Sequence, residues 1–591
     1  MPDNVAAVYR FGPFVLDIAD RSLKRDGVVV ALTPKVFELL AILTANAGRL
    51  VEKDTLLQAV WPDVAVEEGN LNKGVFNLRQ ILGLNSSEVY IETVPKRGYR
   101  FTAVVTSEAL TNSLVSSEEP AKFPSENSVA VLPFSDMSSA RDQEFFCEGM
   151  SEEIISALGR TGELRVASYA SSYRFKAKTT DVRAIGRELM VAWLLEGSVR
   201  KSNETVRISV QLVRASDGFT AWSGRFDRQI GDLFAIQDEI AAMIAQTLVR
   251  RFAKEASVLV TSKTTSAKAY ALYLEGRYLW NKRPGEVVWQ ALERFEQSIA
   301  EDSNFAPAYA ALASVYGTLG AWEFGVLPPA EAMAKAKAAA RRALTLDPQL
   351  AAGHTAVGYA TLHFDWNANA ACRELAQAVA LNPAWVDAHH WHSHALCAAG
   401  RFSESLEACR FTLELDPLNP LMHAHLAWHH YMAKGFDHAL AQAQRVLRME
   451  PSFHWGYFFS GWAHERLGQH DEAVRDLQKA TQCSTNNPVM LAGLGHVLAA
   501  ASDRRAALRI IDELRRMRGR KGLFAYEIAV IHAALDDLDP AFEWFTRAVQ
   551  ERSGWVAYLR VDPRLDRIHK DSRFERLISQ LNNGTAAGSS R

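Results

Sequence analysis

A short segment ending in proline recurs along the C-terminal part of this chain of 591 residues. Its four prolines, Pro348, Pro383, Pro417 and Pro451, are separated by 35, 34 and 34 residues. A period of this length accommodates two antiparallel helices and their turns, and one such pair cannot bury its apolar face without a neighbouring pair. The spacing therefore predicts a stacked array of helix pairs, an all-α superhelix.

These units resemble the tetratricopeptide repeat. Gly461 stands where two helices of one unit must approach closely, and Gly468 marks the turn between them. Weaker copies extend the predicted array to residues 265–552, which a connector at 251–264 precedes. Residues 553–591 resemble the helical cap of such arrays followed by a disordered tail, and an array needs a polar cap to remain soluble.

The first helix of each repeat should line the concave side of the array. Its polar-tipped aromatic side chains would make a suitable groove for a peptide or another ligand, although each of them could instead belong to the core between repeats. The predicted partner groove consists of His390, Trp391, His394, His425, Trp428, Tyr431, Trp455, Phe458, Phe459 and Trp462.

Four histidines in this region form two pairs with a spacing of four residues. His390 pairs with His394, and His425 pairs with His429 one repeat later. Such pairs can bind Zn²⁺ or titrate together near neutral pH. The simpler interpretation is that they pack within the groove, so the sequence assigns no metal site and no cofactor.

The N-terminal segment alternates helical and strand patterns before a basic hairpin. Thr33 and Pro34 suit the start of a helix, and apolar residues at helical spacing predict three helices with one buried face each. The β-rich arms around Lys96, Arg97 and Gly98 predict a hairpin that carries cations at its tip, with Gly98 permitting the turn. The predicted elements are a strand at 11–18, helices at 34–47, 53–61 and 67–82, and the hairpin at 91–101.

Residues 9–105, within a DNA-binding domain predicted at residues 1–105, resemble the OmpR/PhoB-type winged-helix domain (α+β). The resemblance rests on LTPKVFELL (32–40), LLQAVW (56–61), NLR (77–79) and TVPKRGYRF (93–101). It implies that the third helix enters the major groove of double-stranded DNA, that the wing reaches the minor groove, and that the tryptophan after the second helix lies near phosphates. By matching position, it implies DNA contacts for Trp61, Asn70, Lys73, Asn77, Arg79, Thr93, Lys96, Arg97 and Tyr99.

Two features of this domain predict modest DNA affinity. Residues 1–105 contain twelve Lys and Arg and twelve Asp and Glu, so their formal charge is zero, whereas avid DNA-binding domains are basic. Gly74 and Phe76 also stand where members of the family often carry His or Arg. We therefore expect specificity to depend on DNA shape or on dimerisation.

Residues 128–250 alternate strands and helices and predict an α/β domain. The segment resembles the TolB-like domain through VAVLPF (129–134), EGSVR (196–200) and FAIQDEI (234–240), which implies an interaction or ligand-sensing module. We find no catalytic constellation there. Its acidic residues, including Glu148, are expected to be solvated rather than to form a metal site.

The expected cellular location is the cytoplasm. No apolar run approaches the roughly 18–20 residues that span a bilayer. In CadC/ToxR-type relatives a membrane helix follows the winged helix, but the composition of residues 106–127 predicts a flexible linker at this place. Five scattered cysteines without a C-x-x-C pair fit a reducing compartment.

These observations predict a bacterial DNA-binding transcription regulator rather than an enzyme. Its expected partners are double-stranded DNA and a protein, peptide or small molecule that binds in the groove. RNA polymerase and a second copy of the chain on DNA are further candidates, and no membrane partner is expected. We see no phosphoacceptor domain, although winged helices of this type often serve phosphorelays. The alternative is a scaffold whose winged helix binds protein; an adenylate cyclase is disfavoured, since no stretch is left for a cyclase domain.

Overall fold

The computed structural model of the chain divides into two compact units, Met1–Pro120 and Ala121–Arg591. It describes residues 7–17, 22–25, 28–30, 32–60, 68–83, 90–95, 97–103, 105–109, 125–162, 164–176, 181–202, 205–229, 243, 264, 266–281, 287–321, 327–484, 487–521 and 524–588. Among these residues, no helix combines the length and the apolar character needed to cross a bilayer.

The N-terminal unit opens with an antiparallel sheet in the order β4-β3-β2-β1-β8. The stretch at 11–18, expected to be one strand, instead turns at Gly12, where φ is +51°, and contributes to a hairpin. Thr106–Ala109, assigned above to the linker, pairs with the first strand as β8, so the sheet continues beyond residue 105. The strands are β1 Ala7–Phe11, β2 Phe14–Asp17, β3 Ser22–Arg25, β4 Val28–Val30 and β8 Thr106–Ala109.

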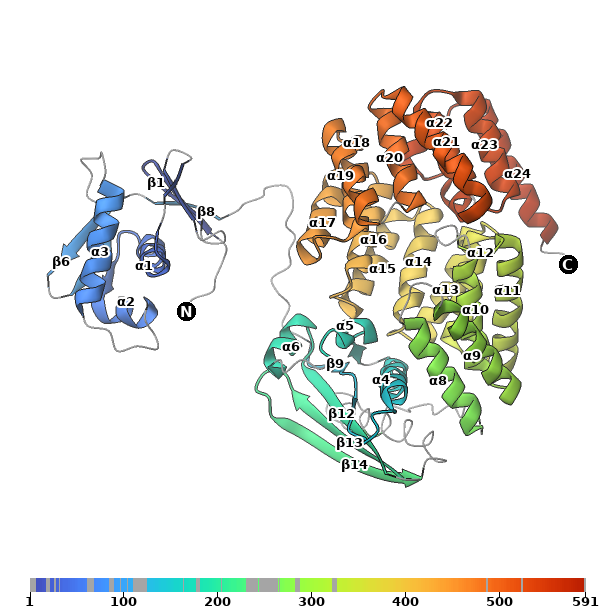
Figure 1. The fold of residues 1–591 in the computed structure, drawn as a ribbon, viewed down its shortest axis with the longest axis horizontal. Helices are drawn as coiled ribbons and strands as arrows, with labels where there is room; N and C mark the ends of the chain where they lie inside the picture. The colour runs from blue at the N-terminus through green and yellow to red at the C-terminus, as the bar shows by residue number, and fades with distance from the viewer. Residues whose placement is uncertain are drawn as a thin grey trace. The chain divides into compact units, whose positions relative to one another are not determined.

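Three helices and a second, three-stranded sheet complete this unit (Figure 1). The helices begin and end within two residues of the predicted positions, because leucines and valines at helical spacing face one core. Thr33 precedes the first helix, but its side chain forms no capping hydrogen bond. The elements are α1 Pro34–Ala45, α2 Lys53–Val60, α3 Glu68–Gly83, β5 Leu50–Glu52, β6 Ile91–Val94 and β7 Gly98–Phe101, in the sheet order β5-β7-β6.

The middle domain is a mixed sheet with helices, in the order β11-β9-β12-β13-β14, and β10 also pairs with β12. Parallel pairing joins β11, β9 and β12, whereas β12, β13 and β14 are antiparallel, so the predicted α/β domain includes an antiparallel half. The motif at 234–240 and connector residues 251–263 lie outside the described residues. The elements are β9 Ser128–Val131, β10 Ser135–Asp136, α4 Glu144–Gly159, β11 Arg165–Val166, α5 Tyr169–Tyr173, α6 Val182–Glu188, β12 Trp193–Ser202, β13 Thr205–Arg214 and β14 Thr220–Gln229.

The repeat region is a superhelix of antiparallel helix pairs (Figure 1). A Cβ at Gly461 would lie 1.7 Å from Leu477 Cδ2, and Gly468 has φ +77°, which confirms their roles in close packing and in the turn. The helices are α8 Ala267–Asn281, α9 Val287–Glu301, α10 Ala306–Leu319, α11 Pro329–Leu346, α12 Ala351–His363, α13 Ala368–Leu381, α14 Val386–Ala398, α15 Phe402–Leu415, α16 Pro420–Met432, α17 Phe436–Met449, α18 His454–Arg466, α19 His470–Cys483, α20 Pro488–Ala500, α21 Arg504–Lys521, α22 Ala525–Ala534 and α23 Leu538–Gln550.

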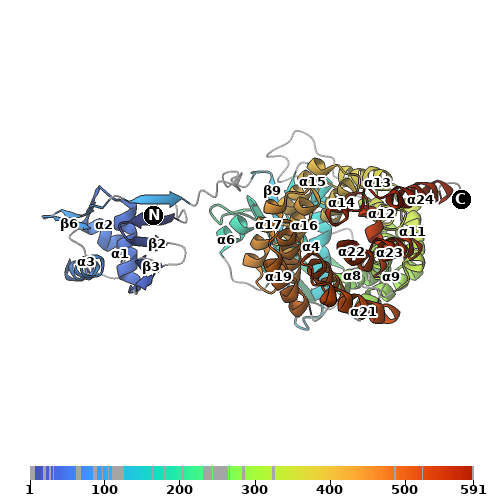
Figure 2. The ribbon, with the colours of Figure 1, turned by 90° about the horizontal axis from the view of Figure 1, so that it is seen from above.

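The C-terminal segment folds back onto the first half of the array instead of only covering its end. It consists of the 3₁₀ helices η2 Gly554–Tyr558 and η3 Pro563–Leu565 and the helix α24 Ser572–Gly588, which extends into the predicted tail. Trp366 Nε1 donates to Ser553 O at 3.0 Å, a contact between residues 187 positions apart. In Figure 2 the C-terminal helices accordingly lie beside α12 and α13.

Candidate DNA-binding surface and ligand cavity

Helix α3 has one buried and one exposed face. Its apolar residues pack into the core of the N-terminal unit, whereas Asn70, Lys73 and Asn77 are exposed. Phe76 is 59% exposed on the same helix. Amides can hydrogen-bond base edges, an ammonium can contact phosphate, and an apolar side chain can contact a thymine methyl group.

Three of the predicted DNA-contacting residues connect this helix to the wing. The Arg79 guanidinium donates to Ile91 O at 3.1 and 2.8 Å and to Thr93 Oγ1 at 2.8 Å. Tyr99 is buried, and its hydroxyl donates to Asn72 Oδ1 at 2.6 Å. Tyr99 is therefore placed in the core rather than on an open surface, and Arg79 and Thr93 orient β6 against α3.

The wing is the hairpin of β6 and β7. Arg97 is exposed in its turn, and its backbone N–H donates to Val94 O at 3.1 Å. Trp61 and Lys96, two further predicted contacts, lie outside the described residues. Among the described residues, the candidate DNA-contacting surface thus includes the exposed Asn70, Lys73 and Asn77 on α3 and the exposed Arg97 on the wing.

Two glycines in this unit are required by close packing that local sequence patterns did not reveal. Gly98 was expected to permit the turn, but its φ is not positive, and a Cβ there would lie 2.0 Å from Val51 O on β5. A Cβ at Gly74 would lie 3.1 Å from Leu39 Cδ2 on α1. Close approach between elements explains both residues.

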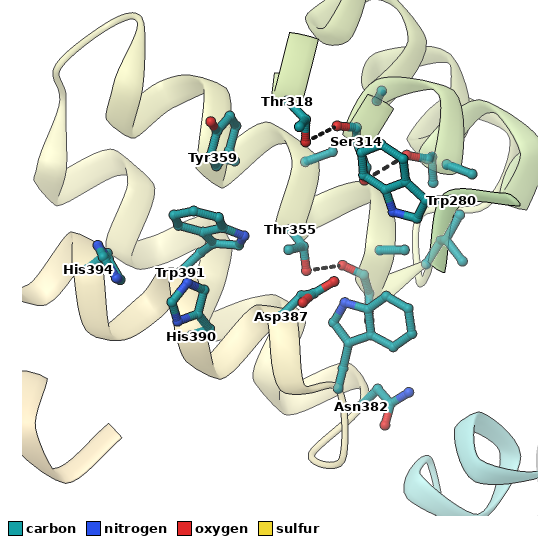
Figure 3. A pocket seen from close by; sticks show the side chains of 18 of the residues that line it. Trp280, Ser314, Thr318, Thr355, Tyr359, Asn382, Asp387, His390, Trp391 and His394 are labelled. Atoms are coloured by element: carbon teal, nitrogen blue, oxygen red, sulfur yellow. Dashed lines mark hydrogen bonds between the residues drawn. The ribbon is translucent and has the colours of Figure 1, made fainter. Parts of the chain in front are cut away.

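A cavity of about 960 Å³ runs along the concave side of the array (Figure 3). The first helices of six successive repeats, α8, α10, α12, α14, α16 and α18, contribute most of its lining, as the sequence predicted. Helix α4 of the middle domain lines the cavity through Glu153, and the C-terminal segment lines it through Trp555. One cavity therefore contacts the middle domain, the array and the C-terminal segment.

Seven of the ten predicted groove residues line this cavity: His390, Trp391, His394, His425, Trp428, Trp455 and Phe459. Tyr431, Phe458 and Trp462 do not line it and are at most 2% exposed, so their assignment to the groove was wrong. They lie in the core between repeats, where Tyr431 and Trp462 have ring centroids 5.4 Å apart.

Tyr359 and His363 also line the cavity, from α12, and were not among the predicted groove residues. Tyr359 follows its repeat proline by eleven residues, as His394 and Trp428 follow theirs. Extending the repeat alignment by one unit could have found it. His363 has no equivalent aromatic residue at its repeat position, and only its packing reveals it: its ring centroid lies 5.3 Å from that of Trp391.

Hydrogen bonds attach the middle domain to the array. Asp416, in the loop between α15 and α16, accepts hydrogen bonds from the hydroxyls of Ser168 and Ser171, the latter at 2.6 Å. At a second point, buried Glu152 on α4 pairs with Arg277 on α8. A shift in the first helices of the array would therefore reach the middle domain directly.

The acidic residues of the middle domain are not uniformly solvated. Glu148 is 3% exposed and pairs with Lys176 Nζ at 2.7 Å, which corrects the expectation for this residue. Burial opposes the charge of Lys176, but its hydrogen bonds to Glu144 and Glu148 raise its pKa above the ordinary value. The cluster is a structural ion pair.

Family models match three parts of the chain. Residues 27–101 match "Transcriptional regulatory protein, C terminal", residues 125–243 match "HilA/YgeH-like transcriptional regulator, second domain", and residues 434–488 and 493–554 match "Tetratricopeptide repeat". The N-terminal unit is thus a winged-helix domain of the type found in transcriptional regulators. The middle match is to the HilA-like second domain, and the TolB-like resemblance stays a prediction.

Relatives carry regulatory and enzymatic names. "Putative adenylate cyclase 3" of Rhizobium meliloti (strain 1021) is 30% identical over 359 residues, covering 60% of this chain and 57% of that protein. "Transcriptional regulator HilA" of Salmonella typhi is 26% identical over 436 residues, covering 73% of this chain and 74% of that protein. The chain therefore spans little more than half the length of the first relative. The solved DNA-binding domain of E. coli CadC is 30% identical, with 17% of this chain and 94% of that chain covered and a TM-score of 0.16.

Proposed function

We propose that this protein is a transcription regulator that binds promoter DNA through α3 and the wing. The observation that carries the proposal is the exposed polar face of α3, which Arg79 and Tyr99 hold beside the wing. The match of residues 27–101 to the C-terminal domain of transcriptional regulatory proteins supports it. Because its proposed partner is chromosomal DNA, we place the regulator in the cytoplasm.

In this proposal, Asn70 and Asn77 read base edges, Lys73 and Arg97 contact phosphates, and Phe76 contacts a thymine methyl group. The last contact would take the place of a contact from the His or Arg that other members of the family often carry at this position. As the family resemblance implies, the helix-flanking Trp61 adds a phosphate contact, and the wing residue Lys96 contacts DNA at the minor groove.

Replacing Lys73 and Arg97 together with alanine should weaken DNA binding and its salt dependence. Each phosphate contact releases about one counterion, so the slope of log K against log salt should become shallower by about 2. The measurement is fluorescence anisotropy with a labelled duplex of random sequence at several salt concentrations.

The matched control is Lys24→Ala, which removes an exposed lysine from β3 in the same unit. It should leave the slope unchanged. Equal slopes for the double variant and the wild type would refute the phosphate contacts, and a wild-type protein that binds no duplex at any salt would favour the protein-binding scaffold.

We further propose that the cavity receives the regulatory partner, a peptide side chain or small molecule with aromatic and polar groups. Trp391, His425 and Phe459 offer aromatic faces, and Asp387 adds a carboxylate to the lining. The middle domain, as an interaction or sensing module, would transmit occupancy through α4. The ligand would shift the population of DNA-binding arrangements because it binds one of them more tightly than the others. RNA polymerase and a second copy of the chain remain candidate partners at the promoter.

A bulky side chain placed in the cavity should reduce its ligand binding. Ala352 on α12 lines the cavity, so Ala352→Trp should reduce the fluorescence that the amphipathic dye anilinonaphthalene sulfonate gains with the full chain by at least half. Thr345→Trp, an exposed substitution on α11, is the control and should not reduce it. Equal dye binding in all three proteins would place the dye, and the proposed receiving site, elsewhere.

A further inference from the structure

Three imidazoles from two repeats meet on the wall of the cavity. His390 and His394 lie on α14 and His425 lies on α16, and one ring nitrogen from each falls within 4.8 Å of the others. The sequence pairs these histidines along single helices, but only the stacking of α14 on α16 brings the three together. Figure 3 shows His390 and His394 projecting from the same stretch of α14 beside Trp391.

We infer that His390, His394 and His425 form a binding site for a divalent d-block cation of the zinc class, with the fourth coordination position facing the cavity. Neutral imidazole is a preferred ligand of such ions, and three protein ligands with one open position are typical of zinc sites that exchange a water molecule or an anion. All three residues line the cavity, so a carboxylate of a cavity ligand could complete the tetrahedron.

A chain of hydrogen bonds fixes the ligand nitrogen of His394. His363 Nδ1 lies 3.2 Å from Tyr359 O, which can only accept, so His363 Nε2 carries a lone pair. The Tyr558 hydroxyl donates to that lone pair at 3.4 Å and therefore accepts from His394 Nδ1–H at 3.1 Å. His394 Nε2 is left with its lone pair directed at His425 Nδ1, 2.9 Å away.

Tyr558 thus orients His394 by a hydrogen bond to the ring nitrogen that does not face the metal site, as the hydrogen-bond partners of metal-binding histidines commonly do. It belongs to η2 of the C-terminal segment, so metal binding would also tie that segment to the central repeats. In the metal-free protein His425 Nδ1–H donates to His394 Nε2, and the ion would replace this proton.

His390 also meets the requirement for a free lone pair, and His425 does so once its proton has moved from Nδ1 to Nε2. His390 is 6% exposed, and its Nδ1 atom is buried without a hydrogen-bond partner, a costly arrangement that a bound cation would relieve. Burial lowers the pKa of all three imidazoles, that of His425 to about 4.

The fourth histidine of the two pairs has a different role. His429 Nε2 lies 3.0 Å from Ser393 Oγ, and its Nδ1 lies 2.8 Å from Ser405 Oγ. Both ring nitrogens are therefore engaged by hydroxyls that fix the packing of α14, α15 and α16. The site accordingly contains three histidines rather than four.

The test uses the untagged full chain, stripped with a chelator and titrated with Zn²⁺ by calorimetry at pH 7. We expect one equivalent to bind and Co²⁺ to give the intense visible bands of a four-coordinate site. His425→Ala, the least buried of the three, should lose both, and His425→Gln, which keeps most of the side-chain volume, should do the same if the alanine variant folds poorly.

Tyr558→Phe and His392→Ala separate the site from general effects on folding. Removing the hydroxyl that orients His394 should weaken Zn²⁺ binding about 10- to 100-fold without changing the stoichiometry. His392 lies on the same helix but does not line the cavity, so its replacement should leave the affinity unchanged. Absence of stoichiometric binding, or equal losses in His392→Ala and His425→Ala, would overturn the proposal.

Discussion

Replacing Gly98 with alanine should break the pairing of the wing strand β7 with β5 and destabilise the N-terminal unit. The added Cβ would lie 2.0 Å from Val51 O and 2.9 Å from Val51 C, and both are backbone atoms of β5, which cannot swing aside as a side chain can. The pairing of Glu52 with Gly98 must break, and the ladder between β5 and β7 is lost. We expect the free energy of unfolding of this unit to fall by about 3 kcal/mol or more.

DNA affinity should fall with stability, because the wing is held against α3 by Tyr99 and Arg79. The measurements are calorimetric unfolding of the full chain and duplex binding. Gly69→Ala is the matched control: a Cβ at Gly69 meets nothing within 4 Å, and alanine in α3 should stabilise the helix by up to about 1 kcal/mol. Identical unfolding temperatures for Gly98→Ala and the wild type would show that β5 and β7 do not approach as closely as described.

The second large effect is expected at the ion pair of Asp562 and Arg564, in the C-terminal segment. Arg564 donates to Asp562 through Nε at 2.9 Å and Nη2 at 2.6 Å, and the Tyr526 hydroxyl donates to the same carboxylate at 2.9 Å. Burial opposes ionisation of Asp562, yet the charge and hydrogen bonds of Arg564 hold its pKa below the ordinary value. Asp562→Ala would leave a buried guanidinium without its partner and should cost about 3–5 kcal/mol.

Tryptophan fluorescence can follow this loss locally. The Arg564 guanidinium lies 4.1 Å from the ring centroid of Trp462 and 5.2 Å from that of Trp555, so both indoles should report the change during urea unfolding. Arg573→Ala removes a more exposed arginine that pairs with Asp571 and Asp539. This variant should leave the midpoint of urea unfolding unchanged, because exposed ion pairs contribute little to stability. Similar shifts of the urea unfolding midpoint for Asp562→Ala and Arg573→Ala would mean that the buried ion pair stabilises the protein no more than the exposed one.

Local periodicity explains what could be predicted from the sequence. The helices of the N-terminal unit and the repeats follow from apolar residues three and four positions apart, and the proline spacing of 34 or 35 residues follows from the length of one helix pair. The side of the array that lines the cavity follows in the same way. Trp462 follows its repeat proline by eleven residues, as the cavity-lining His394 and Trp428 do, so its repeat position alone did not show that it is buried in the core.

Contacts between distant residues explain what could not be predicted. The local sequence predicts Gly98 to be a turn residue. Glycine is required there because any Cβ would collide with the carbonyl group of Val51 on another strand. Thr106–Ala109 has the composition of a linker, and it becomes a strand because the edge of β1 is available for pairing. Neither contact leaves a pattern within the segment itself.

The sequence by itself determined the winged-helix domain, through its resemblance to a known family, and the repeat array with its cavity-lining inner helices, through a repeating pattern; it did not determine the antiparallel half of the middle domain. Only the tertiary structure decided that the array closes on its own C-terminal segment and that three histidines of two repeats meet. The physical reason is that both depend on the curvature of the stacked pairs, which sums many small rotations between neighbours and brings Tyr558 to His394 across 164 residues.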